Sequence, residues 1–465
     1  MSLLDTLKRL IDELDRVHPD GVAAPSAWDD ISRGGILNFV RAANGQERFF
    51  TKVSLESLDD VSATFYENDR SIAAIMDQKH FGEIVRSCVV NLHAEGALSA
   101  NALDESRAAL KVAIQSHVAK IRLLYTHYIP CWTLGIEAQQ PFVLGPVTFL
   151  TREQWIDSVN FPPDAIKGFD DAPEANTRWK GELKTMLTKG PGQIDAETSR
   201  GLARDIYFSV RDCPSLLKVT IQGYQLDLSK KVGEIVCKAA LDSVSLLLAR
   251  RDFFFQQALA QERLPPFKSS SIIETNGFLW LPGSSFGPRA RSGNQAQIRD
   301  YLAENPECIE AFATILQALV SPGEARHPNL AKRWSTALDW YAEGQRERND
   351  AVSLAKIATC LDVLSCGGRF SGILEMLVSL LGVPASTVFV NGRAPLTLAQ
   401  LVRNIYERGR SQILHGTEFD RLKSFETSRN QATSLARLTL LEAAVRLKSF
   451  KGSDDDNLAF RRMPK

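Results

Sequence analysis

The chain has 465 residues and carries 55 Lys and Arg against 55 Asp and Glu, so its formal net charge is zero. This balance argues against a protein that coats nucleic acid through bulk positive charge, because nonspecific affinity comes mainly from Lys and Arg that displace counterions. A chain of this length with 44% hydrophobic residues predicts about two to four domains, each with its own core. Any basic surface must therefore be local.

The N-terminal stretch MSLLDTLKRLIDELDRVHPDG lacks the basic start, the apolar run and the cleavage site of a signal peptide. The most apolar stretch, at 373–383, is too short to span a bilayer and contains Glu375. The seven cysteines are scattered and form no CxxC pair, which indicates neither a disulfide framework nor a zinc site. We therefore expect a cytoplasmic protein without membrane span, metal or cofactor.

The first part of the chain mixes helical and strand patterns. Apolar residues at helical spacing predict helices over 3–17, around 60–80, over 104–125 and over 232–254. Aromatic and β-branched residues between Gly and Pro predict a small sheet at about 131–150, and alternation predicts a further strand over 218–228. The segments 160–200 and 267–294 are rich in turn residues. We expect residues 1–325 to form a mixed α and β part.

The rest of the chain is patterned almost entirely as helix. Helices are predicted over 329–347, 350–366, 370–382, 396–416 and 426–450, and several end at Gly. Short connections between helices of this length favour an antiparallel bundle. The fold class expected is therefore α+β, with an all-α bundle at 326–465 after a boundary near 320–326.

Several familiar catalytic motifs are absent or lack their context. The sequence contains neither GxxxxGK[ST] nor HExxH, which argues against an ATPase and a zinc protease. GSSFG at 283–287 matches G-x-S-x-G, but Pro282 and Pro288 flank it and no helix pattern follows. A Gly/Ser loop explains Ser285 better than a hydrolase nucleophile does.

The most informative stretch is IYERGRSQILHGT at 405–417, which holds Arg410, Ser411 and His415. A His titrates near neutrality and can transfer protons, while an Arg stays charged and can hold a phosphate through two hydrogen bonds. Together they suffice for phosphodiester transfer without a metal, with the Arg balancing the charge that develops in the transition state.

Five residues place Arg410 and His415 about 140° apart on an ideal helix. Two arrangements bring them together: His415 lies at the unwinding helix end beside Gly416, or a second copy of the helix supplies the missing group. The stripe of Leu398, Val402, Ile405, Gly409 and Ile413 is apolar, and the small Gly409 permits close approach of another helix. A composite site in a homodimer is one reading of this stripe.

The helix at 396–416 with RSQILHG resembles the signature of the HEPN superfamily, and the form RSxxxHG is similar to its Apea-like branch. The preceding stretch ALDWYAEGQRERNDAVSLAKIATCLDVLS resembles the opening of that branch and contains Asp362. The likeness covers about the last 140 residues. It implies a helical, metal-independent endoribonuclease that acts as a homodimer.

The resemblance implies that Arg410 stabilises the phosphate, His415 is the acid or base, Ser411 is the polar residue after the Arg, and Asp362 orients them. The family commonly has Glu where this chain has Asp362. Arg408 also falls within the spacing that the motif allows, and Arg410 is preferred because a polar residue follows it. The N-terminal part would then sense a trigger, such as a phage component, in antiphage defence or as part of a toxin.

Two alternatives stay open. Lys and Arg outnumber Asp and Glu from Arg393 onward, which suits RNA steering but equally a solvated surface. A non-catalytic bundle of the same kind, which dimerises and presents the N-terminal part to a protein or a nucleic acid, is the rival to a nuclease. Convergence of Arg410 and His415 in an open cleft would favour the nuclease.

Overall fold

The fold was analysed in a computed structural model, which describes residues 2–32, 38–121, 124–166, 174–190, 202–262, 268–270, 273–279, 284–286, 294–392, 394–418, 420 and 422–463. The contacts divide the chain into two units. Unit 1 comprises Met1–Tyr125 and Ile221–Lys231, and unit 2 comprises Thr126–Thr220 and Val232–Lys465. The secondary structure is α+β, as the sequence predicts, with helix far in excess of strand.

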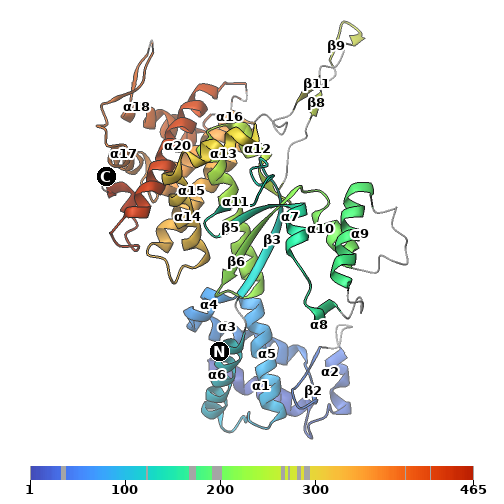
Figure 1. Cartoon of the computed structure of the whole chain (residues 1–465). Helices are drawn as coiled ribbons and strands as arrows, with labels where there is room; N and C mark the ends of the chain where they lie inside the picture. Colours follow the sequence, from blue (N-terminus) through green and yellow to red (C-terminus); the bar gives the residue numbers. More distant parts are fainter. Residues whose placement is uncertain are drawn as a thin grey trace. The chain divides into compact units, whose positions relative to one another are not determined.

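Unit 1 is a group of helices with one short hairpin (Figure 1). The helices are α1 (Leu3–Val17), α2 (Trp28–Ser32), α3 (Lys52–Asn68), α4 (Arg70–Ile75), α5 (Gln78–Ala94) and α6 (Leu103–Lys120), and η1 (Pro25–Ala27) is a 3₁₀ turn. β1 (Phe39–Arg41) pairs antiparallel with β2 (Glu47–Phe49).

The predicted N-terminal helix is α1, and its apolar stripe forms part of the core of unit 1. Ser2 and Asp5 form a capping box that satisfies the first backbone N–H groups. Leu7, Leu10 and Leu14 are fully buried, and α1 packs on α3 and α6. Burying each such side chain contributes about 1.5–3 kcal/mol relative to an exposed position. The 3.6-residue periodicity therefore predicts this helix and its buried face correctly.

The centre of unit 2 is a five-stranded sheet in the order β4-β5-β6-β3-β7. Its strands are β3 (Leu124–Trp132), β4 (Phe142–Leu144), β5 (Val147–Thr151), β6 (Ser215–Gln222) and β7 (Ala258–Leu259). The pairs β4/β5, β5/β6 and β3/β7 are antiparallel. In β6, Val219 and Ile221 are buried while Lys218 and Thr220 are exposed, the alternation of a strand.

Helices cover this sheet on two sides (Figure 1). On one side lie α7 (Arg152–Ser158), α9 (Ala175–Lys189) and α10 (Leu202–Val210), whose core includes Trp155 and Trp179, and α8 (Pro163–Ile166) is a single turn nearby. On the other side lies α11 (Leu226–Leu248). It ends at Ala249, whose φ is 61°, and α12 (Arg251–Gln256) follows.

The remaining strands are short antiparallel pairs. β8 (Lys268–Ser270) pairs with β11 (Ser284–Phe286), and β9 (Glu274–Thr275) pairs with β10 (Phe278–Leu279). Ser285 lies in β11, so its backbone is a hairpin strand, while its neighbours 287–290 and the basic RARSG at 289–293 lie outside the described residues. β12 (Val388–Val390) pairs with β13 (Leu396–Thr397).

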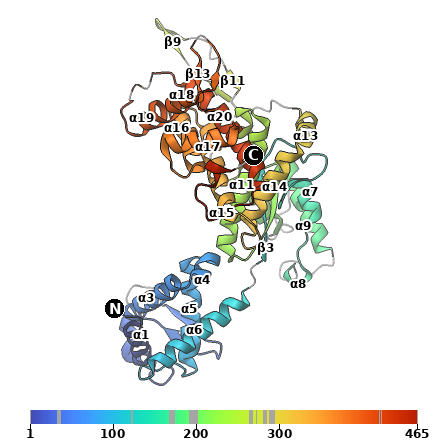
Figure 2. The same cartoon turned by 90° about the vertical axis from the view of Figure 1, so that its left-hand side faces the viewer.

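The C-terminal half of unit 2 is mostly helical, as the sequence predicts, but the β12/β13 hairpin interrupts the range expected to be all-α. Its helices are α13 (Gln295–Ala303), α14 (Pro306–Val320), α15 (Pro328–Arg346), α16 (Asp350–Leu364), α17 (Arg369–Leu381), α18 (Leu398–Arg403), α19 (Gln412–Leu414), α20 (Glu426–Ser449) and α21 (Ala459–Arg462). Figure 2 shows α16, α17 and α20 side by side, and contacts also join α20 to α14 and α15. Trp334 is fully buried in this bundle and donates a hydrogen bond to the Leu440 carbonyl.

The helix predicted over 104–125 ends at Lys120, and β3 begins at Leu124, before the predicted start of the sheet. Two further expectations differ from the structure. The predicted strand over 218–228 is β6 only to Gln222, and α11 begins at Leu226, because the turn at Gly223, with a φ of 87°, ends the strand. The boundary expected near 320–326 does not separate the two units, since α14 on one side of it packs on α15 and α20 on the other. Helix packing outweighs the turn composition there.

No single helix in the described part of the chain has the length and apolar character needed to cross a membrane. The α16–α17 pair, bent by 70°, meets these criteria only when its two helices are counted together.

Candidate functional site

The predicted motif lies on one helical run of unit 2 that changes its geometry in the middle. α18 begins at a capping box formed by Thr397 and Gln400. It continues into η3 (Asn404–Ser411), a π-helical segment that carries Arg410, and then into α19. π-Helical turns close i→i+5 hydrogen bonds, are rare and often occur at functional sites. The predicted single helix at 396–416 is therefore present, but a wider π segment interrupts it.

Gly409 brings this run against α16 of the same chain. A Cβ atom at Gly409 would lie 2.7 Å from Cδ2 and 3.1 Å from Cγ of Leu354, which is fully buried in α16. Val402 and Ile405 of the predicted stripe are also buried within the bundle. The helix that Gly409 admits is therefore α16, and this stripe is not a surface for a second copy.

Arg410 is held from two sides. Its Nη2 lies 3.4 Å from Oδ2 of Asp362 on α16, and its Nη1 donates a 3.0 Å hydrogen bond to the hydroxyl of Tyr406. The guanidinium also lies 5.2 Å from the centre of the Tyr406 ring, and Nε is 3.4 Å from Oγ1 of Thr359. A quarter of the Arg410 side chain stays exposed. The charge is fixed in direction yet accessible from solvent.

Asp362 also organises the turn between α16 and α17. Its Oδ1 accepts the backbone N–H of Arg369 at 3.2 Å, and its own carbonyl accepts the N–H of Gly367 at 2.7 Å. One carboxylate oxygen therefore binds the turn while the other faces Arg410. The structure brings Asp362 and Arg410 together, although they are far apart in sequence.

His415 lies at the end of the helical run and is exposed. Gly416 adopts a φ of 69°, its N–H donates to the Ile413 carbonyl, and the Thr417 N–H donates to the Gln412 carbonyl. These bonds form a Schellman C-cap, which a residue with positive φ makes possible. The structure places His415 at the helix end beside Gly416, as in the first of the two arrangements considered, but it shows no bond between His415 and Arg410.

In the described residues, His415 is not bonded to the Arg410 cluster. Across the described residues, no hydrogen bond or ion pair joins its imidazole to Arg410 or Asp362, and the Ser411 carbonyl accepts only the backbone N–H of His415. Arg410 faces α16, whereas His415 faces solvent.

The structure distinguishes Arg408 from Arg410. Arg408 is exposed, and no ion pair to it is found in the part of the chain described here. Arg410 instead faces Asp362 and Tyr406. Arg410, the arginine that the polar Ser411 follows, is thus also the one whose side chain the fold orients.

Sequence reasoning missed Tyr406 and Thr359. Tyr406 precedes Arg410 by four positions, and Thr359 precedes Asp362 by three, so each pair shares a helix face. This spacing is a usable signal once Arg410 and Asp362 have been singled out. The contact between the two helices, however, has no local signal in the sequence.

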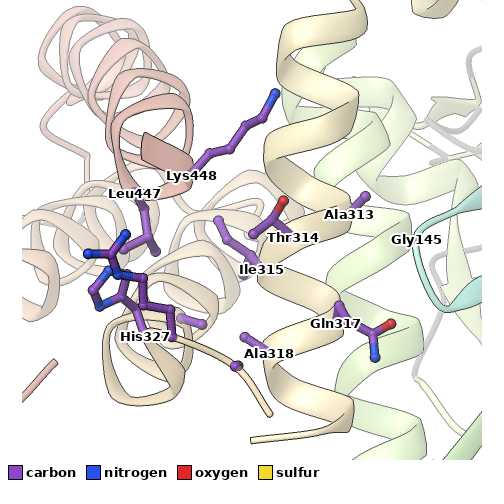
Figure 3. A pocket seen from close by; sticks show the side chains of 12 residues that line it. Gly145, Ala313, Thr314, Ile315, Gln317, Ala318, His327, Leu447 and Lys448 are labelled. Atoms are coloured by element: carbon purple, nitrogen blue, oxygen red, sulfur yellow. The ribbon is translucent and has the colours of Figure 1, made fainter. Parts of the chain in front are cut away.

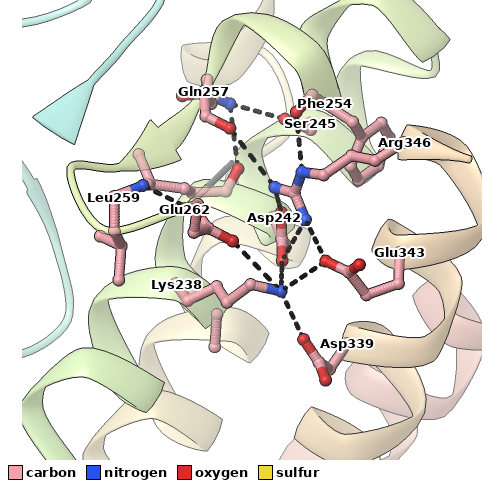
Figure 4. A network of polar contacts seen from close by, with 12 residues as sticks. Lys238, Asp242, Ser245, Phe254, Gln257, Leu259, Glu262, Asp339, Glu343 and Arg346 are labelled. Atoms are coloured by element: carbon pink, nitrogen blue, oxygen red, sulfur yellow. Dashed lines mark hydrogen bonds and ion pairs between the residues drawn. The ribbon is translucent and has the colours of Figure 1, made fainter. Parts of the chain in front are cut away.

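A second cluster of charged side chains joins α11 to α15 (Figure 4). Arg346 pairs with Asp242 and donates to the Phe254 carbonyl at 2.9 Å, and Lys238 lies 3.2 Å from Glu343. Burial by itself would lower the pKa of Lys238, but the nearby carboxylates, Asp242 first, raise it above its ordinary value. Each charged head group has an opposite charge beside it, so the cluster is typical of one that stabilises the packing of α11 on α15.

Unit 1 contains a group that could hold a metal ion. Nδ1 of His80 lies 3.6 Å from Oδ1 of Asp77 and 3.4 Å from Oδ2 of Asp227. Oδ1 of Asp77 already accepts the backbone N–H of His80 as the N-cap of α5. No sequence pattern predicts this cluster, because Asp227 comes from the distant segment 221–231.

Comparison of the chain with protein-family models, with curated proteins and with solved structures found no match.

Proposed function

We propose that the chain is a metal-independent endoribonuclease that uses Arg410 and His415. The observation that carries the proposal is the fixed position of Arg410, held between Asp362 and Tyr406 on the same helical run that ends at the exposed His415. Arg can bind a phosphate through two parallel hydrogen bonds, and His can exchange protons near neutral pH. The likeness of RSQILHG to the HEPN signature points to the same chemistry.

In the proposed reaction, the 2′-hydroxyl of the RNA attacks the adjacent phosphorus. The 2′-hydroxyl loses its proton as a bond forms between O2′ and phosphorus, the bond to O5′ breaks, and O5′ takes up a proton. The products are a 2′,3′-cyclic phosphate and a 5′-hydroxyl. His415 transfers a proton at O2′ or O5′, and Arg410 balances the charge on the phosphate oxygens. Asp362 and Tyr406 act as positioning residues for Arg410.

A homodimer is the proposed active form. Leu414, next to His415, is 60% exposed, and Leu422 is 96% exposed. Exposed apolar side chains of this size are candidate contacts for a second copy. Two such protomers would place the Arg and His of both around one scissile phosphate.

The proposed setting is the cytoplasm, in antiphage defence or as part of a toxin. An RNase of this kind harms its own cell unless it is restrained. We therefore assign the N-terminal part the role of sensing a trigger, such as a phage-derived molecule, or of holding the nuclease inactive through a partner.

The test is cleavage of RNA by the purified full chain in EDTA, with analysis of the product ends. Arg410→Ala and His415→Ala should each lower the cleavage rate by about 100- to 10,000-fold, the range of general acid–base catalysis. Arg408→Ala is the matched control, because it removes the neighbouring exposed Arg and should cleave at close to the wild-type rate. Products without a cyclic phosphate, or a need for divalent metal, would disprove the mechanism.

The dimer is tested by mixing the two inactive variants. A heterodimer of Arg410→Ala and His415→Ala contains one intact Arg and one intact His, so the mixture should regain part of the activity that both variants lack. Introduced alone into the otherwise wild-type chain, Leu422→Asp should shift the equilibrium towards the monomer in analytical ultracentrifugation. A mixture that stays inactive although heterodimers form would exclude a composite site.

One observation favours the rival function, a non-catalytic dimerisation scaffold. Arg410 is engaged by Asp362 and Tyr406, as an Arg with a purely structural role would be. In that case Arg410→Ala would lower the melting temperature of the chain, and neither the wild type nor any variant would cleave RNA in EDTA. The same set of proteins therefore separates the two functions.

A further inference from the structure

Three side chains that can bind a metal ion converge in unit 1 from two segments that are far apart in the sequence. Asp77 and His80 lie at the start of α5, and Asp227 lies in the first turn of α11. Their ligand atoms are Oδ1 of Asp77, Nδ1 of His80 and Oδ2 of Asp227, which all lie within 4.8 Å of one another. One imidazole and two carboxylates are a donor set that zinc accepts in proteins.

The distances within this group are too long for hydrogen bonds but suit ligands of one ion. Nδ1 of His80 lies 3.6 Å from Oδ1 of Asp77 and 3.4 Å from Oδ2 of Asp227. An N–H···O hydrogen bond measures about 2.7–3.2 Å. Zinc binds nitrogen and oxygen at about 2.0–2.2 Å, so neighbouring ligands of a tetrahedral ion lie about 3.3–3.5 Å apart. An ion therefore fits between the three atoms after a small rotation of the Asp227 side chain.

Nδ1 of His80 has no other partner. The atom is buried, and no described group forms a hydrogen bond with it. Buried polar atoms without a partner are rare in folded proteins and need an explanation. An ion between the three ligand atoms reaches Nδ1 from the side of the carboxylates, so it needs no further opening beside the ring. The side chain of Asp227 is 56% exposed, which gives an ion access from solvent on that side.

The backbone holds the three ligands in place. Asp77 is the N-cap of α5, and its Oδ1 accepts the backbone N–H of His80 at 2.9 Å. The N–H of Gln225 donates to the Ile75 carbonyl at 2.7 Å and ties the start of α11 to the end of α4. Oε1 of Gln225 accepts the N–H of Asp227 at 2.9 Å. Binding of an ion therefore requires little further ordering of the chain.

The two carboxylates have no Lys or Arg to balance their charge. Among the described residues, the ion pairs of Asp77 and Asp227 involve only His80. Both carboxylates lie at helix N-termini, which favour the ionised form, and this is the form that binds a metal. The group is thus negatively charged when His80 is neutral, and a divalent cation balances that charge.

A cavity of about 530 Å³ in unit 2 offers no such donor set (Figure 3). It lies between α14, the start of α15 and the end of α20, and its polar lining includes Arg326, His327 and Lys448. No Asp, Glu or Cys is among the described residues that line it. An imidazole and carboxylates are brought together at His80 and not at His327.

We propose that Asp77, His80 and Asp227 form a zinc site in unit 1, with water completing the coordination on the exposed side of Asp227. The imidazole ligand favours zinc over Mg²⁺ and Ca²⁺, which prefer oxygen ligands. The bound ion joins the first turn of α11 to the start of α5 and stabilises unit 1. The inference does not rest on the proposed nuclease, whose Arg410 and His415 belong to unit 2.

The probe is zinc alone, added to the full chain after treatment with EDTA and transfer to a buffer without chelator. Isothermal titration should show saturable binding with a micromolar or lower Kd, and Mg²⁺ should bind at least about tenfold more weakly, which corresponds to about 1.4 kcal/mol. Zinc should also raise the melting temperature of the chain, because it binds the folded state.

Three variants locate the site, and each should weaken zinc binding at least about tenfold. Asp77→Asn keeps a side-chain oxygen that caps α5, so it removes the charge of the ligand and not the cap. Asp227→Asn changes an exposed side chain, and His80→Gln removes the imidazole. Asp60→Asn and His117→Gln are the matched controls, since both residues are exposed and neither belongs to the group.

The proposal is overturned if zinc does not bind the wild-type chain at millimolar concentration, or if Mg²⁺ binds as tightly as zinc. It is also overturned if Asp77→Asn and Asp227→Asn bind zinc like the controls, since the ion then lies elsewhere, for example at the partly exposed thiols of Cys308 and Cys366. These two variants decide the matter even where His80→Gln fails to fold, because the first keeps the cap of α5 and the second changes an exposed side chain.

Discussion

Nη2 of Arg410 lies 3.4 Å from Oδ2 of Asp362, although the two residues belong to different helices, η3 and α16. The other oxygen of the same carboxylate accepts the backbone N–H of Arg369 and is thereby tied to the turn after α16. An Arg whose partner is itself fixed loses little side-chain entropy when it binds a phosphate. On the proposed function, this helix–helix contact would hold Arg410 ready for a phosphate of the RNA.

Asp362→Asn should lower the turnover number for RNA cleavage by about 10- to 100-fold, because Arg410 loses the charge that orients it. The Asn side chain keeps an oxygen for the N–H of Arg369, so the melting temperature should change little. Asp362→Glu should restore part of the activity. The measurement is steady-state cleavage with turnover number and KM determined separately.

Glu407→Gln is the control for this variant. Glu407 is exposed on the same helical run and pairs with Arg403, so its loss removes a carboxylate without touching Arg410. Equal losses of activity in Asp362→Asn and Glu407→Gln would mean that general charge, and not the Asp362 contact, matters.

Gly409→Ala should lower the free energy of unfolding of unit 2 by about 1–3 kcal/mol, since the added methyl group overlaps the buried Leu354. Cleavage activity should fall with it, because η3 must move away from α16. Gly323→Ala is the matched control: a Cβ there meets no atom within 4 Å. Chemical denaturation measures both, and a Gly409→Ala chain as stable as the control would show that the contact is loose.

Asp242→Ala should destabilise unit 2 by about 3–5 kcal/mol, because it leaves the guanidinium of Arg346, whose side chain is only 14% exposed, without its main partner. Asp339→Ala removes a half-exposed carboxylate that pairs with Lys238 and should cost less than about 1 kcal/mol. Denaturant titration of the two variants compares them directly. Similar losses in the free energy of unfolding for both variants would show that the two carboxylates of the cluster in Figure 4 contribute equally to stability.

Unit 1 should become less stable in mild acid because of His18. Its Nδ1 lies 3.1 Å from the Leu14 carbonyl, and its Nε2 accepts the backbone N–H of Phe49 at 3.0 Å, so the folded chain favours the neutral ring. Burial lowers the pKa of His18 from its ordinary value of 6.5 to about 4. Burial also lowers the pKa of His93, which accepts a hydrogen bond from Arg48.

Between about pH 6.5 and 4 the unfolded chain binds a proton at His18 that the folded chain does not. The stability is therefore complete above about pH 6.5 and falls as the pH drops towards 4, by at most about 1.4 kcal/mol per pH unit for this one group. His18→Gln should flatten this dependence in thermal unfolding scans, whereas His117→Gln, at an exposed position, should not. Identical slopes in both variants would rule out His18 as the cause.

The sequence by itself predicted the helices well, because amphipathic periodicity is local. α1, α15, α16, α17 and α20 lie within a few residues of their predicted ranges. The alternation in β6 was also visible, but its end was placed too late, since the turn at Gly223 interrupts a pattern that continues into α11.

The candidate site was only partly predictable. Arg410, Ser411 and His415 follow from residue types and spacing along one helix, and the position of His415 beside Gly416 follows from the preference of helix ends for Gly. The small residue Gly409 in the apolar stripe was compatible with packing against a second copy of the chain. In the structure, α16 of the same chain packs there instead. A small residue shows that something packs closely, but not what it is.

The sequence alone determined the α+β class, most of the helix ranges and the motif with Arg410 and His415, because each depends on residues near one another along the chain. Only the tertiary structure decided that Asp362 and Tyr406 hold Arg410 and that α14 and α15 belong to one unit. These features depend on which helix packs against which. That choice is made by the fit of many side chains at once, and no local pattern encodes it.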